Sequence, residues 1–163
     1  MASTSGSGAA SPGLVRENRQ VALSAPGTWI ACLRTMKSIL IAEGYGGVAE
    51  LYAALFGRDG WTVTTYSDGQ HAADALRGRT PFDAVVVSNR LRSISGVELI
   101  WQIRALGHRR DVPIVMITGT VDVILVASAL AAGADEVLYK PADVVMVVDT
   151  VNKCVERRRP QNP

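Results

Sequence analysis

The chain has 163 residues, of which 48% are apolar and 20% are charged, and its formal net charge is +2. This length favours a single domain, and the apolar share is large enough for a full core. A net charge this small argues against a strong electrostatic field for nucleic acid. No apolar run is long enough to cross a bilayer. We therefore expect a protein that binds neither nucleic acid nor membrane.

The chain contains two cysteines, Cys32 and Cys154. Their spacing matches neither a metal site nor a disulfide framework. We expect free thiols in a reducing compartment, which for this chain means the cytoplasm.

The N-terminal part differs in composition from the rest, because residues 1–13 are rich in Ser, Gly and Ala. Such a stretch is typical of a flexible extension. We predict a flexible extension or tag over residues 1–35, a folded domain over residues 36–159 and a tail over residues 160–163. A natural start at Met36 is an alternative that the sequence leaves open.

The predicted domain alternates short β-branched runs with longer amphipathic segments, which is typical of a parallel sheet with helices on both faces. Strands are expected at residues 39–43, 62–66, 83–88, 113–118 and 136–140. Helices are expected at residues 47–58, 69–78, 96–106, 121–132 and 142–158.

Ser88 ends the apolar run 82–87, which predicts a buried parallel strand. The carboxyl end of such a strand faces the crevice where open α/β sheets bind ligands. A carboxylate there could accept a phosphoryl group as an acyl phosphate. A serine without a nearby base cannot, because its hydroxyl is a weak nucleophile at neutral pH.

Four further segments lie in order around Ser88: Lys37–Glu43, Gly60–Gly69, Val112–Thr118 and Ala131–Pro141. With these segments, the chain from Lys37 to Arg158 resembles the receiver domain of bacterial two-component response regulators. The resemblance implies a flavodoxin-like, doubly wound, five-stranded parallel sheet of strand order 2-1-3-4-5, with helices on both faces. It also implies a cis peptide bond between Lys140 and Pro141.

The family's phosphorylation-site positions fall on Glu43, Gly44, Ser88, Thr118 and Lys140. The phosphoacceptor aspartate is replaced by Ser88, and one member of the acidic pair that holds Mg²⁺ is replaced by Gly44. The family's aromatic switch position falls on Val137. We therefore expect no catalytic residue, no metal site, no cofactor and no enzymatic activity.

The crevice has two interpretations. Glu43 is the obvious counter-charge for Lys140, because an ammonium buried alone is strongly disfavoured. In the first interpretation Lys140 pairs with Glu43 and hydrogen-bonds Ser88 as a structural remnant. In the second, Lys140, Thr118 and Ser88 bind an anion.

The last two predicted helices carry more apolar residues than one buried face requires. In the last helix we expect Val144, Val148, Val151 and Val155 in the core. In the preceding helix we expect Val123, Val126 and Leu130 in the core. The residues left over, and therefore the interface candidates, are Val121, Ile124, Leu125, Val145 and Met146. Exposed apolar patches of this kind usually mark a binding surface.

These observations favour a phosphorylation-independent pseudo-receiver that binds a protein in a phosphorelay pathway. The resemblance implies a homodimer through the fourth helix, fifth strand and fifth helix as one such partner. The alternative is a receiver with nonstandard phosphoryl or small-anion binding in the crevice. The pair Arg109–Arg110 is a separate candidate for contact with an acidic partner, or else part of a solvated loop beside an exposed His108.

Overall fold

The computed structural model describes residues 36–141 and 143–158, with the exception of the Val144 side chain. The strands are β1 (Ser38–Ala42), β2 (Thr62–Tyr66), β3 (Ala84–Ser88), β4 (Ile114–Thr118) and β5 (Glu136–Tyr139). The helices are α1 (Gly46–Arg58), α2 (Gly69–Arg77), α3 (Gly96–Ala105), the 3-10 helix η1 (Gly107–Arg109), α4 (Val123–Ala132) and α5 (Val144–Arg158). The predicted extension 1–35 and tail 160–163 lie outside the described residues.

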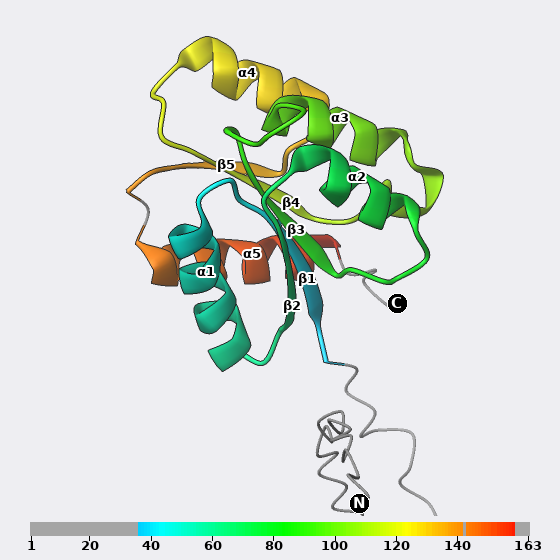
Figure 1. Ribbon diagram of the computed structural model, residues 1–163, viewed down its shortest axis with the longest axis vertical. Helices are drawn as coiled ribbons and strands as arrows, with labels where there is room; N and C mark the ends of the chain where they lie inside the picture. The colour runs from blue at the N-terminus through cyan, green and yellow to red at the C-terminus, as the bar shows by residue number, and fades with distance from the viewer. Residues whose placement is uncertain (1–35, 142, 159–163) are drawn as a thin grey trace, which may run out of the picture. The chain divides into compact units, whose positions relative to one another are not determined.

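The five strands form one parallel sheet in the order β2-β1-β3-β4-β5, which confirms the predicted topology. Helices α2, α3 and α4 cover one face of the sheet, and α1 and α5 cover the other (Figure 1). Because the chain order reverses on either side of β1 and β3, a crevice forms at the carboxyl ends of these strands. No helix among the described residues is long and apolar enough to cross a membrane.

Two apolar layers follow from the alternation of side chains along each strand. In β1, Ile39 and Ile41 pack under α1 and α5, whereas Leu40 and Ala42 pack under α2 and α3. All four side chains are fully buried. The central strands are therefore apolar on both faces, as expected for a parallel sheet covered by helices.

Side-chain caps determine where three helices begin. The carboxylate of Asp68 accepts hydrogen bonds from the backbone N–H groups at the start of α2, and Asp122 does the same for α4. Ser95 caps α3 through the N–H of Glu98. Such caps satisfy backbone donors that have no partner within the helix. Helix α4 ends at Gly133, whose φ of 110° is a left-handed conformation that favours glycine.

The predicted core face of α4 is wrong. Val123 is 81% exposed and Leu130 is 49% exposed, whereas Leu125 packs against the core. The Asp122 cap starts the helix two residues later than expected, and Leu125 and the buried Ala129 then face inward with helical spacing. Leu125 is therefore not an exposed interface residue, whereas Val121 and Ile124 are exposed as predicted.

The predicted core face of α5 is confirmed in large part and is wider than expected, because Val147 and Cys154 are also buried. Val147 is fully buried, and Val148 is only half-buried beside it. Val151 and Val155 are buried as expected, while Val144 lies outside the described side chains. Val145 is 70% exposed and Met146 is 45% exposed, which confirms that these two lie outside the core.

Candidate functional site: the crevice at the carboxyl ends of the strands

Four of the predicted site residues come together at one edge of the sheet. Glu43 follows β1, Ser88 ends β3, Thr118 ends β4, and Lys140 follows β5. These strands are successive neighbours in the sheet, so their carboxyl ends meet. Glu43, Ser88 and Thr118 are all buried. The polar side chains therefore line the inner part of a crevice rather than an open surface.

Glu43 and Lys140 form the predicted ion pair, with 2.6 Å between Glu43 Oε2 and Lys140 Nζ. The other carboxylate oxygen accepts a hydrogen bond of 3.1 Å from the backbone N–H of Tyr45. The Lys140–Pro141 peptide bond is cis, as the resemblance implied. Both oxygens of Glu43, the only carboxylate expected in the site, are thus engaged within the domain. Burial, together with the nearby Glu43 charge, raises the pKa of the Tyr52 hydroxyl.

The hydroxyls of Ser88 and Thr118 differ in their hydrogen bonds within the described residues. Thr118 Oγ1 accepts a hydrogen bond of 3.1 Å from the backbone N–H of Thr120. Among the described residues, no hydrogen bond from Lys140 to Ser88 is found, so that part of the structural interpretation is wrong. The Lys140 ammonium instead turns to Glu43 and lies 5.9 Å from the centre of the Tyr45 ring.

The crevice contains a small pocket of about 110 Å³. Its lining comprises Tyr45, Ser88, Asn89, Arg90, Thr118, Gly119 and Lys140. The lining includes two cationic side chains and three hydroxyls, those of Tyr45, Ser88 and Thr118, and no carboxylate among the described residues. Sequence analysis identified Ser88, Thr118 and Lys140. It missed Asn89 and Gly119, although each directly follows the end of a strand.

The position of Gly44 is covered by the chain that follows β3. A Cβ atom built on Gly44 would lie 2.5 Å from the backbone carbonyl oxygen of Arg90, closer than real Cβ contacts. Residue 44 therefore cannot carry a side chain unless the β3–α3 loop moves. With the loop in this position, there is no space beside Glu43 for a carboxylate at residue 44.

The β3–α3 loop is held in this place by the turn before α2. Ser93 Oγ donates a hydrogen bond of 2.5 Å to Asp68 Oδ2, and Gly69 donates its N–H to the Arg92 carbonyl at 3.1 Å. The hydrogen bond from Ser93 lowers the pKa of Asp68. A Cβ on Gly69 would clash with Ile94. The loop that closes over Gly44 is therefore tied at its centre to a neighbouring turn.

The donor set does not suit a divalent cation. Mg²⁺ prefers several oxygen ligands, and carboxylates supply the charge that displaces its water. No group of three or more His, Cys, Asp or Glu side chains that could hold a metal occurs within residues 36–141 and 143–158. Arg90 and Lys140 instead give the pocket a positive lining.

Fold and crevice together define a flavodoxin-like domain with a polar pocket at the carboxyl ends of its parallel strands. The family model for the response regulator receiver domain matches residues 39–152. The chain therefore belongs to the response regulator receiver domain family.

Two curated relatives are a transcriptional regulatory protein and a response regulator. The chain is 29% identical to the transcriptional regulatory protein CseB of Streptomyces avermitilis over 73% of this chain and 49% of that protein. It is 29% identical to the response regulator ArlR of Staphylococcus aureus over 77% of this chain and 55% of that protein. The chain thus spans about half the length of the curated relatives it matches.

A solved structure supplies a direct contrast. The receiver domain of the sensor histidine kinase PA1611 of Pseudomonas aeruginosa PAO1 holds a magnesium ion in its active-site cleft. It is 25% identical to this chain, with a TM-score of 0.68, and the match covers 74% of this chain and 98% of that one.

Proposed function

We propose that this receiver domain signals through protein contacts and does not accept a phosphoryl group. The observation that carries the proposal is the Arg90 carbonyl over Gly44, next to Ser88 in the acceptor position. Phosphoryl transfer needs a nucleophile, a divalent cation and groups that stabilise the developing charge. The crevice offers only the last of these, through Thr118 and Lys140.

The immediate surroundings of Ser88 support this proposal. A serine hydroxyl needs an adjacent base to become a useful nucleophile. Lys140 lines the same pocket as Ser88 but forms an ion pair with Glu43 at 2.6 Å, and an ammonium has no lone pair for a proton. Glu43 is turned toward that ammonium. Neither group is placed to activate Ser88.

Mass spectrometry after incubation with acetyl phosphate and Mg²⁺ tests the proposal. We expect no mass gain on the intact protein. A canonical receiver treated in parallel shows that the reagent is active. A stoichiometric phosphoryl adduct at Ser88 would refute the proposal.

The proposed contact surface consists of α4, β5 and α5. Exposed apolar residues gather there: Val121, Val123, Ile124, Leu130, Tyr139, Val145 and Met146. Large side chains exposed in such numbers on two helices that flank the same edge strand, β5, usually indicate an interface. A second copy of the chain and a different signalling protein are both compatible with this surface.

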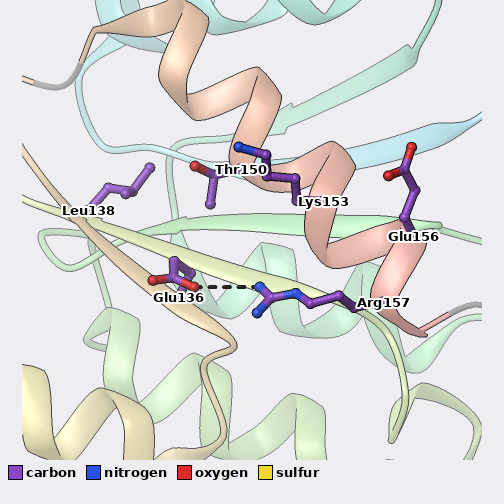
Figure 2. Close-up of a pocket in the computed structure, with 6 residues that line it drawn as sticks. All are labelled: Glu136, Leu138, Thr150, Lys153, Glu156 and Arg157. Carbon is purple, nitrogen blue, oxygen red and sulfur yellow. Dashed lines mark hydrogen bonds and ion pairs between the residues drawn. The ribbon is translucent and has the colours of Figure 1, made fainter.

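A groove between β5 and α5 runs through this surface (Figure 2). It has a volume of about 460 Å³. Leu138 and Thr150 contribute apolar atoms, and Glu136, Lys153 and Arg157 line it with charges of both signs. Glu136 and Arg157 face each other at 3.5 Å. Apolar contacts flanked by mixed charges are typical of protein interfaces.

A second candidate function is small-anion binding in the crevice. The 110 Å³ pocket favours it, because its lining combines the charges of Arg90 and Lys140 with the hydroxyls of Ser88 and Thr118. Thermal shift measurements with phosphate, sulfate and acetate test this alternative. Stabilisation that disappears in the variant Arg90→Ala supports it, and the absence of any stabilisation contradicts it.

A further inference from the structure

The side chain of Arg109 is buried, whereas the sequence analysis gave a solvated loop as one interpretation of the pair Arg109–Arg110. Arg109 is only 6% exposed. Its guanidinium donates to three backbone carbonyls, those of Leu76, Gly78 and Thr80. It also lies 5.6 Å from the centre of the Phe82 ring. Within the described part of the chain, no carboxylate forms an ion pair with Arg109, so its charge is offset by carbonyl dipoles and the Phe82 ring.

These contacts fix the short segment that carries Arg79. The Nη2 atom of Arg109 bonds to the carbonyls of Gly78 and Thr80, the residues on either side of Arg79. The backbone of Arg79 is therefore held at both ends. Its exposed side chain has no ion pair within the described part of the chain. A cation on a fixed backbone loses less conformational entropy when it binds a ligand.

A pocket of about 510 Å³ lies beside this segment. Arg77, Arg79, Pro81, His108 and Arg109 line it. In the described structure the Nη1 atom of Arg109 has no hydrogen-bond partner, and no buried side-chain nitrogen or oxygen atom is left unsatisfied. Nη1 is therefore open to solvent, and this pocket is the accessible space that Arg109 lines.

The charges of the side chains that line this pocket sum to a positive value. Arg77 is neutralised by its ion pair with Asp74 and also donates to Gln102. Arg79 and Arg109 each add one positive charge. The carboxyl end of α2 opposes them with about half a negative charge. The pocket retains a net attraction for an anion with more than one charge.

We infer that this pocket binds the phosphate group of a small organic molecule through Arg79 and Arg109. The exposed Arg79 guanidinium matches phosphate because it presents parallel N–H donors in a fixed plane. Arg109 adds only its Nη1 donor, because its Nε and Nη2 atoms bond to backbone carbonyls. The volume exceeds that of a phosphate ion and lies in the range of roughly 300–1,000 Å³ typical of small-molecule sites. Pro81 supplies an apolar wall for the organic part. The site is distinct from the crevice and does not depend on the proposed function.

Titration of the full chain with ribose 5-phosphate, followed by amide chemical shifts in NMR, tests the inference. We expect shifts around residues 77–81 and 107–110. The variant Arg79→Ala should weaken binding about tenfold, equal to about 1.4 kcal/mol. Ribose serves as the uncharged control ligand. Arg90→Ala is the matched control variant, because Arg90 is an exposed arginine on the crevice.

Three results would overturn the inference. The first is the absence of shifts at these residues with both ribose 5-phosphate and inorganic phosphate. The second is binding that Arg90→Ala weakens and Arg79→Ala does not, which would assign the anion to the crevice. The third is equal weakening by both variants, which would indicate unspecific attraction by positive charge.

Discussion

The backbone carbonyl oxygen of Arg90 lies 2.5 Å from the point where a Cβ atom on Gly44 would stand. Arg90 lies two residues after Ser88, the last residue of β3. The loop that follows Ser88 therefore occupies the space that a side chain at residue 44 would need.

The first prediction concerns Gly44. Replacing it with Ala should destabilise the fold by about 1–3 kcal/mol, the usual cost of inserting atoms into a tightly packed position. Gly47→Ala is the matched control, because a Cβ there meets nothing within 4 Å. In a helix this control should stabilise the protein by up to about 1 kcal/mol. Urea denaturation of both variants measures the difference. Equal stabilities would show that the loop over Gly44 moves freely.

The same contact predicts the behaviour of a restored acceptor. Ser88→Asp alone should remain a poor phosphoryl acceptor, because one carboxylate at Glu43 is paired with Lys140 and no second one is available. Adding Gly44→Asp should not rescue the reaction, since the Asp side chain clashes with the Arg90 carbonyl. Mass spectrometry after treatment with acetyl phosphate and Mg²⁺ measures both. Efficient labelling of the double variant would contradict this account.

The sequence predicted the sheet well because each strand is a short β-branched run between turn residues. The strand bounds agree to within about two residues, and the strand order followed from the family resemblance. The ion pair between Glu43 and Lys140 followed from the cost of burying a lone charge. These features depend on local pattern or on a single strong physical requirement.

Other features depend on contacts that the sequence does not display. The rotation of α4 was wrong because nearly every residue in it is apolar, so periodicity could not select a face. The burial of Arg109 was missed because its partners are backbone carbonyls, which every residue carries and no sequence pattern marks. The closure of the loop over Gly44 depends on Asp68 and Ser93, which lie 25 residues apart.

The second prediction concerns Lys140. Its replacement by Met leaves the carboxylate of Glu43 buried and unpaired, which costs about 3–5 kcal/mol for a fully buried pair. We expect a loss below that range, about 2–3 kcal/mol, because the Lys140 side chain is 25% exposed. The double variant with Glu43→Gln should recover part of the loss. Lys153→Met is the control, because its pair with Asp149 is exposed and screened by solvent, so its loss should change stability little. Equal losses at Lys140 and Lys153 in chemical denaturation would contradict the prediction.

The third prediction is a pH dependence at Asp68. The hydrogen bond from Ser93 lowers the pKa of Asp68 below its ordinary value of 3.8. A lowered pKa in the folded state stabilises the fold above pH 3.8, and this contribution is lost as the pH falls through the folded-state value. Ser93→Ala should therefore lower the free energy of unfolding at pH 7. At the most acidic pH where both proteins remain folded, the unfolding free energies of the variant and the parent protein should become similar. Ser67→Ala is a control in the same turn. A stability difference for Ser93→Ala that does not change with pH would show that Ser93 acts through packing.

The last prediction concerns the surface formed by α4, β5 and α5. Val145→Glu should weaken self-association, or binding of a partner recovered by pull-down, because it places an unpaired charge in an apolar contact. A buried unpaired charge costs about 2–5 kcal/mol at an interface. The fold should survive, since Val145 is 70% exposed in the isolated domain. Trp101→Glu is the matched control, an equally exposed apolar residue on α3.

Analytical ultracentrifugation and circular dichroism separate the outcomes of this substitution. A standard interface buries roughly 800 Å² on each partner around an apolar centre, so one charge at that centre should weaken the affinity strongly. Unfolding of Val145→Glu would mean that this residue supports the core. If the variant folds and both self-association and partner binding keep their affinities, the interface lies elsewhere. The loop from Arg90 to Arg92 then becomes the next surface to test. Weakening by Val145→Glu and not by Trp101→Glu would assign the contact to this surface, because both variants place a carboxylate at an exposed apolar position and only Val145 lies on this surface.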